Sequence, residues 1–245
     1  MFKDIMKGGA RKLGLYVAST GRLGIDLEID LARLTTDEPV RTIFDVGGNF
    51  GQTALRFAAA FPTACIFTFE PVPASFERLI RSTRHNERVK PFKLAMGDAA
   101  GIVTMHLTHS PGSNSIVRTG SAIGAVDVSI DTVDAFADRQ ATGIIDLLKI
   151  DVEGYELQVL RGASQRLREG RIRYVFTECV FSPNSDMPHT SFFELHRVLD
   201  EAGFCFVNYY AEAFNLRLGC AQGNVLYALR STLPRHAAGG VRNIC

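Results

Sequence analysis

The sequence predicts an α/β fold built on a mainly parallel sheet. From Arg41 onward, short runs of β-branched and aromatic residues alternate with longer segments in which apolar residues recur at helical spacing. This alternation is typical of a sheet whose strands are joined by crossover helices. At 245 residues, of which 46% are apolar and 22% charged, the chain can bury one large core, so one main domain is expected.

Each element is predicted from one of two periodicities. Strands are expected where a short apolar run is bounded by turn residues, and helices where apolar residues recur every three or four positions until Pro or Gly ends the run. The predicted strands are 42–46, 65–69, 89–95, 145–150, 172–177, 204–210 and 224–229. The predicted helices are 52–60, 73–86, 132–138, 155–160 and 191–202.

Two regions depart from the alternation. Residues 102–130 contain two strand-like runs around a Pro-Gly-Ser-Asn turn, which predicts a small antiparallel insertion. No helix separates the last two strands, so we expect them to pair as an antiparallel hairpin at the sheet edge. The predicted domains are an N-terminal helical extension (1–40), the main domain with its insertion (41–232) and a flexible tail (233–245).

Charge and cysteine usage exclude some partners and favour one compartment. The chain has 27 basic and 26 acidic residues, so it lacks the positive surplus that drives nucleic-acid binding. Its five cysteines form no CxxC pair, and no apolar run approaches the roughly 18 residues of a membrane span. A cytoplasmic location is expected. The basic opening segment 1–17 predicts a helix packed on the core, with peripheral contact to a membrane surface as the alternative. The sequence gives no indication of an oligomeric state.

The segment Asp45-Val-Gly-Gly-Asn-Phe-Gly-Gln-Thr53 predicts a nucleotide-type ligand. At a strand-to-helix turn, glycines let the backbone approach a ligand, and the free amides of the helix start favour an anionic group. The dinucleotide fingerprint G-x-G-x-x-G would place its first glycine at Val46, which disfavours an NAD-type oxidoreductase. S-adenosylmethionine carries an ammonium and a carboxylate, which suit a carboxylate and a hydroxyl from this segment. The residues expected to bind it are Asp45, Gly47, Gly48, Asn49, Gly51 and Thr53.

Two acidic residues follow later strands. Glu70 ends the second strand, where an acidic side chain can accept hydrogen bonds from a ribose diol. Asp98 follows Gly97 after the third strand and is expected to accept from an adenine amino group, with a turn-forming role as the alternative.

The run Ile145-Asp-Leu-Leu-Lys-Ile-Asp-Val-Glu-Gly-Tyr-Glu-Leu-Gln-Val-Leu-Arg-Gly-Ala163 closely resembles the signature of FkbM-type methyltransferases. The segments 45–51, 69–71 and 97–98 fit the same family, and the similarity runs from about Thr42 to Leu229. The resemblance implies a class I methyltransferase fold, a Rossmann-like three-layer sandwich around a mostly parallel seven-stranded sheet. It also implies S-adenosylmethionine as methyl donor and, usually, a hydroxyl acceptor on a sugar, glycolipid, polysaccharide or secondary metabolite such as a polyketide.

The resemblance further implies that the 102–130 insertion helps to cover the acceptor. Two positions depart from the family pattern. Gly48 stands where the glycine loop often has Ala, and Cys179-Val180 follows Glu178 where a nearby His is expected. A general base from the end of the fifth strand is therefore not carried over from the family.

The expected order of the strands locates the acceptor site independently of the family resemblance. Asp151 and Glu178 end two strands that should be neighbours about 5 Å apart, so their carboxylates are expected to converge. An aliphatic hydroxyl needs either a general base or a cation that lowers its pKa. We expect Asp151, with Glu178, to position the acceptor and either to take its proton or to hold a divalent cation such as Mg²⁺. Lys149 lies on the same strand face as Asp151 and either tunes it electrostatically or forms a buried ion pair.

Other polar residues near this run have simpler interpretations. Glu153 precedes a helix and is expected to cap its free amides. His106, His109 and His189 are alternative general bases, although each is more typical of a surface residue.

The expected function is that of an S-adenosylmethionine-dependent O-methyltransferase acting on a small molecule, sugar or lipid-linked glycan. The alternatives are an NAD-type oxidoreductase and a non-catalytic nucleotide-binding module. A nucleic-acid substrate is disfavoured because Asp151-Val-Glu-Gly-Tyr155 replaces an N-P-P-Y-like run.

Overall fold

The structure, a computed structural model, describes residues 23–35, 38–117, 122–181, 190–215 and 220–233. The predicted helix over 1–17, His189 and the tail from residue 234 lie outside this part of the chain. Within it, none of the helices combines the length and the apolar character that crossing a membrane requires.

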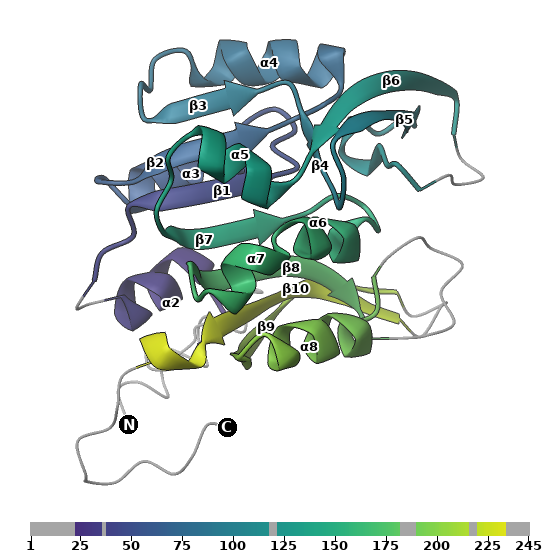
Figure 1. The fold of residues 1–245 in the computed structure, drawn as a ribbon. Helices are drawn as coiled ribbons and strands as arrows, with labels where there is room; N and C mark the ends of the chain where they lie inside the picture. Colours follow the sequence, from purple (N-terminus) through teal and green to yellow (C-terminus); the bar gives the residue numbers. More distant parts are fainter. Residues whose placement is uncertain (1–22, 36–37, 118–121, 182–189, 216–219, 234–245) are drawn as a thin grey trace, which may run out of the picture.

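Seven of the described strands form the main sheet (Figure 1), in the order β3-β2-β1-β7-β8-β10-β9. The pairs from β3 through β8 are parallel, whereas β10 runs antiparallel to both β8 and β9. This confirms the parallel sheet with a C-terminal antiparallel hairpin at its edge. The strands are β1 (Thr42–Val46), β2 (Cys65–Phe69), β3 (Val89–Phe92), β7 (Ile145–Ile150), β8 (Ile172–Val180), β9 (Phe204–Asn215) and β10 (Cys220–Leu229).

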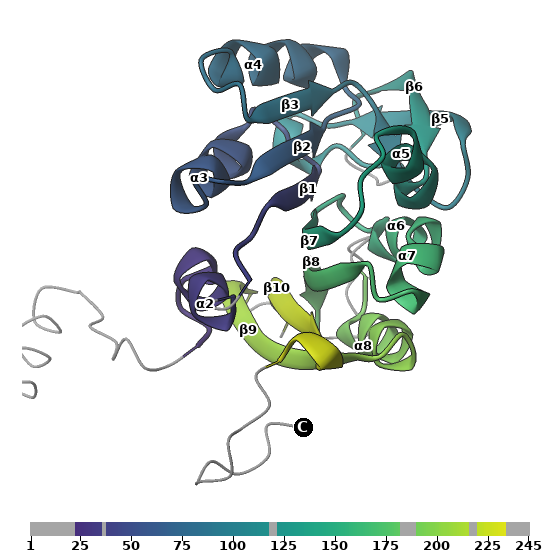
Figure 2. The same cartoon turned by 60° about the vertical axis from the view of Figure 1, so that its left-hand side comes forward.

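Helices cover both faces of this sheet and make three layers (Figure 2). One buried cluster joins α2 and α3 to the sheet, and another joins α5, α6, α7 and α8 to the opposite face. The three-layer prediction is thereby confirmed. The helices are α2 (Leu27–Leu34), α3 (Gln52–Ala60), α4 (Pro73–Thr83), α5 (Val133–Arg139), α6 (Glu156–Gly162), α7 (Ser164–Arg168) and α8 (Phe192–Glu201).

The predicted insertion is a separate small sheet. Its strands are β4 (Ala95–Met96), β5 (Gly101–Leu107) and β6 (Gly124–Asp131), in the order β4-β6-β5. β5 and β6 are antiparallel, as predicted, and a short 3-10 helix, η1 (Pro111–Ser113), lies in the loop between them. The insertion rises beside the edge of the main sheet at which the strands β1, β2 and β7 end (Figure 1).

Several predicted boundaries are wrong for reasons that lie in long-range contacts. The third strand stops at Phe92, because Ala95 and Met96 pair with β6 of the small sheet instead. α4 ends at Thr83, three residues before the predicted end. The short helix α7 was not predicted. Asp134, at the start of α5, accepts hydrogen bonds from the amides of Gln165 and Arg166 and so stabilises the first turn of α7.

A cluster of aromatic rings forms the core between α5 and the strands β1, β2 and β3. Phe136 of α5 lies edge-on to Phe69 and Phe92, with ring centroids 4.8 Å away in each case. Its ring also packs against Phe44 and Phe67 of the central strands. Edge-to-face pairs of this kind add to the free energy of burial. Phe136 therefore joins the helical layer to β1, β2 and β3, two of which carry the site.

Replacing Phe136 by Ala should lower the free energy of unfolding by about 3–5 kcal/mol, because it leaves a cavity among four rings. Denaturant titration measures this change. Phe193→Ala is the control, because that ring is 65% exposed and should change stability by less than about 1 kcal/mol. Equal effects of the two variants would show that the aromatic cluster does not carry the core.

Candidate functional site

A cavity opens at the carboxyl ends of β1, β2 and β7. It encloses about 630 Å³ of space, part of it open to solvent. Ligands of open α/β sheets bind at this edge, outside the ends of the strands. Its walls come from the turn after β1, the end of β2, the turn after β7, and the insertion, which contributes Met105, Asn114 and Ile116.

The glycine turn after β1 is forced by close packing. Gly47 has φ +85°, and a Cβ atom there would lie 1.8 Å from the carbonyl oxygen of Asp151. A Cβ on Gly48 would lie 2.1 Å from the Thr68 hydroxyl. Neither contact is possible, so both glycines are required for the turn to lie against the neighbouring strands. The family-typical Ala at position 48 would not fit here without a shift of Thr68.

Glu70 lies at the end of β2 and lines the cavity. Its Oε2 atom accepts a hydrogen bond from the Asn49 amide at 3.0 Å, and its Oε1 atom accepts one from the Val72 amide at 2.9 Å. Burial outweighs these hydrogen bonds and raises the pKa of Glu70 to about 7. The side chain thus fixes the glycine turn and presents a carboxyl group to the position predicted for a ribose.

Lys149 links the end of β1 and its glycine turn to Asp151, the residue that follows β7. Its side chain is buried, with Nζ 3.1 Å from Asp45 Oδ1 and 3.5 Å from Asp151 Oδ2. Nζ also donates a hydrogen bond to the Gly47 carbonyl at 2.8 Å. Burial alone would lower the pKa of Lys149, but the carboxylates of Asp45 and Asp151 more than offset it and raise the pKa above 10.5. The buried ion pair expected for Lys149 is present and includes Asp151, while its electrostatic tuning of Asp151 stays a prediction.

Asp45 lies beneath the cavity. It is fully buried, and its Oδ2 atom accepts a hydrogen bond from the Thr68 hydroxyl at 2.9 Å. The cavity-lining residues do not include it. Its contact with a cofactor stays a prediction, and the structure adds a role that the sequence did not indicate, the anchoring of Lys149.

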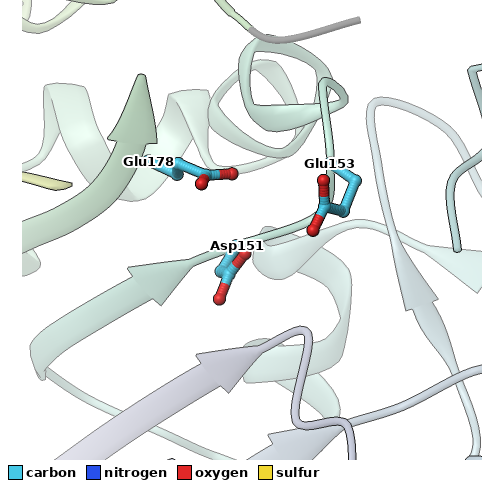
Figure 3. Close-up of side chains that lie close together, drawn as sticks. All are labelled: Asp151, Glu153 and Glu178. Atoms are coloured by element: carbon cyan, nitrogen blue, oxygen red, sulfur yellow. The ribbon is translucent and has the colours of Figure 1, made fainter. Parts of the chain in front are cut away.

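The predicted convergence of Asp151 and Glu178 is confirmed. The last pair of β7 and β8 joins Ile150 to Thr177, so the next residue of each strand carries a carboxylate at the same edge. One carboxylate oxygen from each of Asp151, Glu153 and Glu178 lies within 4.8 Å of the other two, and Figure 3 shows the three side chains around a common space. We call these three residues the acid cluster.

Glu178 is the buried member of the acid cluster. It is 6% exposed, and its Oε1 atom accepts a hydrogen bond from Gln222 Nε2 at 2.7 Å. Burial and then the charge of Asp151 raise the pKa of Glu178 to about 8. Near neutral pH this carboxyl group is therefore present in both its protonated and its charged form, as groups used for acid–base chemistry are.

Glu156, the first residue of α6, holds the turn that precedes this helix, and the expected capping role of Glu153 stays a prediction. Glu156 Oε1 accepts hydrogen bonds from the amides of Val152 and Gly154, and Tyr155 occupies the N-cap position without a side-chain cap. Glu153 has φ +55°, a left-handed conformation that is uncommon for a residue other than Gly, Asn or Asp. Its carboxylate joins the acid cluster, which capping patterns in the sequence did not reveal.

Other predicted residues are not part of the cavity lining. Gly51 is the N-cap of α3 with φ +91°, and Thr53 is half-buried in the first turn of that helix. Asp98 and His109 are exposed, and His106 is half-buried in β5. None of these five lines the cavity. The sequence did not reveal the lining side chains of the insertion or the contact of Gln222 with Glu178, because only the folded topology brings these residues together.

A sequence model of the methyltransferase FkbM domain family matches residues 45–206, more than half of the chain. The chain belongs to this family. It is 27% identical over 158 residues to the 2-O-methyltransferase NoeI of Sinorhizobium fredii, covering 58% of this chain and 64% of that protein. It is 28% identical over 154 residues to the hexuronic acid methyltransferase AglP of Haloferax volcanii, covering 62% of each. The chain thus matches less than two thirds of the length of either relative.

Among solved structures, the N-terminal domain of EvdMO1 in the presence of SAH and D-fucose aligns with a TM-score of 0.48 and 12% identity, over 94% of this chain and 98% of that one. Aeropyrum pernix fibrillarin with bound S-adenosyl-L-methionine aligns with a TM-score of 0.46 and 14% identity, over 82% of this chain and 74% of that one.

The raised pKa of Glu178 predicts a pH-dependent stability. Its pKa is about 8 in the folded chain and near 4.5 when unfolded, so the folded state holds a proton that the unfolded state has lost between these values. Stability contributed by this group is present below pH 4.5 and is lost as the pH rises toward 8. Glu178→Gln should therefore gain stability relative to the wild type as the pH rises from about 5 to about 8.

Denaturant titrations at several pH values measure this difference, and comparison with the wild type cancels the contribution of Glu70. Glu87→Gln serves as the exposed control and should show a constant difference across the range. A constant difference for Glu178→Gln as well would mean that Glu178 titrates normally.

Proposed function

We propose that this chain transfers a methyl group from S-adenosylmethionine to a hydroxyl group of a sugar, of a lipid-linked or other glycan, or of a secondary metabolite. The observation that carries the proposal is the arrangement of the cavity. A glycine turn and Glu70 form one wall, and Asp151 and Glu153 of the acid cluster line another, with Glu178 beside them. Family membership supports the same assignment, as do one relative named a 2-O-methyltransferase and another named a hexuronic acid methyltransferase.

The first wall fits the donor. S-adenosylmethionine, when bound, supplies an electrophilic methyl group on a sulfonium. Glu70 can accept hydrogen bonds from its ribose diol, and the glycine turn leaves room for the rest of the molecule against the backbone. The apolar side chains of Val72, Met96 and Ile116 offer a surface for the adenine ring. We propose that Asp45 and Thr53 act on the amino acid part of the donor, Asp45 through Lys149.

The acid cluster fits the acceptor. A sugar hydroxyl donates its hydrogen bond to a carboxylate, and a carboxylate whose pKa lies near the working pH removes the proton most effectively. We assign positioning of the hydroxyl to Asp151, held by Lys149, and proton removal to Glu178. Alignment of the two reactants in the cavity supplies the rest of the acceleration.

A divalent cation is the second candidate for activating the hydroxyl. Three carboxylates with oxygens within 4.8 Å are a donor set that suits Mg²⁺ or Ca²⁺, and Asp151, Glu153 and Glu178 would be the residues that hold it. The Lys149 ammonium, 3.5 Å from Asp151, already supplies positive charge and weakens the attraction for a cation. We therefore favour the general base.

The donor assignment predicts binding of the demethylated product, S-adenosylhomocysteine. Calorimetric titration of the wild type should give a Kd on the order of micromolar, and Glu70→Ala should weaken binding at least tenfold, by about 1.4 kcal/mol or more. Glu77→Ala is the control, because Glu77 lies exposed on α4. No binding by the wild type, with or without Mg²⁺, would remove the methyltransferase proposal.

The acceptor assignment predicts a separation of binding from turnover. Asp151→Asn and Glu178→Gln should each lower methyl transfer to hydroxylated sugars by about 10²-fold or more, while affinity for S-adenosylhomocysteine stays within about twofold. Transfer is measured with labelled S-adenosylmethionine, before and after chelation of divalent cations, and Glu87→Gln is the control. Turnover unchanged in both variants would contradict the assignment, and turnover abolished by chelation would favour the cation.

A further inference from the structure

The turn after β7 holds an unfavourable backbone conformation. Glu153 has φ +55° and Gly154 has φ +97°. Among the described residues, the non-glycine residues with positive φ are Asn49, Glu153 and Ala141, and the first two line the cavity. A non-glycine residue keeps such a conformation only where its surroundings determine it strongly, and such positions cluster at functional sites.

Two side chains act on this turn from opposite sides. Glu156 accepts hydrogen bonds from the amides of Val152 and Gly154. The carbonyl of Glu153 instead accepts a hydrogen bond of 2.6 Å from the hydroxyl of Ser115, a residue of the insertion. Glu156 thus holds the N–H groups on either side of Glu153, while Ser115 holds its carbonyl.

Ser115 is itself fixed within the insertion. It is 2% exposed, and its hydroxyl oxygen accepts a hydrogen bond from the Val117 amide at 2.9 Å. Its backbone exchanges two hydrogen bonds with His106 of β5, at 2.7 and 3.1 Å. The hydroxyl is therefore held in place before it meets Glu153, and its neighbours Asn114 and Ile116 line the cavity.

We propose that Ser115 is a positioning residue, whose hydroxyl keeps Glu153 in its left-handed conformation and so holds the Glu153 carboxylate in the acid cluster. The same hydrogen bond joins the insertion that lines the cavity to the turn that carries Asp151 and Glu153. Without it, the peptide between Glu153 and Gly154 can rotate, because glycine tolerates either orientation. The catalytic consequence rests on the proposed function, whereas the effect on the turn does not.

Hydrogen–deuterium exchange of the full chain tests the effect on the turn. In Ser115→Ala, the amides of residues 151–156 should exchange about tenfold faster than in the wild type, the effect expected from one lost hydrogen bond. The strands β9 and β10 should be unchanged. Ser113→Ala is the matched control, since Ser113 lies exposed in the same loop and should leave residues 151–156 as in the wild type.

A second pair of variants keeps the test valid if Ser115→Ala fails to fold. Thr and Val have the same shape and differ by one hydroxyl, so Ser115→Thr should retain the protection of residues 151–156 and Ser115→Val should lose it. Equal exchange at these residues in Ser115→Ala and the wild type, or in the Thr and Val variants, overturns the proposal.

Kinetics separate the two proposals. If the chain transfers methyl groups, Ser115→Ala should lower kcat about tenfold and leave the KM for S-adenosylmethionine within about twofold, because the lesion lies on the acceptor side. A rise in this KM with unchanged kcat contradicts the positioning role. If the wild type neither binds S-adenosylhomocysteine nor transfers methyl groups, the proposed function fails, and the exchange measurement alone still decides the role of Ser115.

Discussion

The site depends on a buried ammonium group shared by two carboxylates. Lys149 lies between Asp45, which is fully buried, and Asp151, which reaches the cavity, and it also donates to the carbonyl of Gly47. A buried carboxylate without a partner would be costly, and so would a buried ammonium. Each group therefore requires the other, and together they hold the glycine turn against the end of β7.

The sheet register makes this arrangement possible. Asp45 pairs with Lys149 across β1 and β7, and β7 and β8 end together so that Asp151 and Glu178 follow side by side. Parallel strands bring their carboxyl ends to one edge, so acids that are distant in the sequence meet there. The tight contact of Gly47 with Asp151 then fixes the distance between the proposed donor wall and the acid cluster.

Much of the fold and part of the site could be predicted from the sequence. The strands 42–46, 65–69 and 145–150 were predicted with their observed bounds, because each is a buried apolar run between turn residues. The meeting of Asp151 with Glu178 also followed from strand order. The left-handed conformation of Glu153 and the depth of Asp45 could not be predicted, because both depend on contacts with segments far along the chain. For the same reason, nothing in the local sequence marked Ser115 as a partner of Glu153, since 38 positions separate the two residues.

The most direct test of the shared ammonium is a double-mutant cycle on the free energy of unfolding, with Lys149→Met, Asp45→Asn and the double variant, and Lys93→Met as an exposed control. Lys149→Met should cost about 3–5 kcal/mol, because it leaves Asp45 buried without its counter-ion. In the double variant the side chain at position 45 is an uncharged amide and needs no counter-ion. The loss of unfolding free energy in the double variant should therefore be smaller than the sum of the losses in the two single variants by at least about 1 kcal/mol. Additive effects would show that Lys149 and Asp45 act independently, and the account of the site built on their interaction would be wrong.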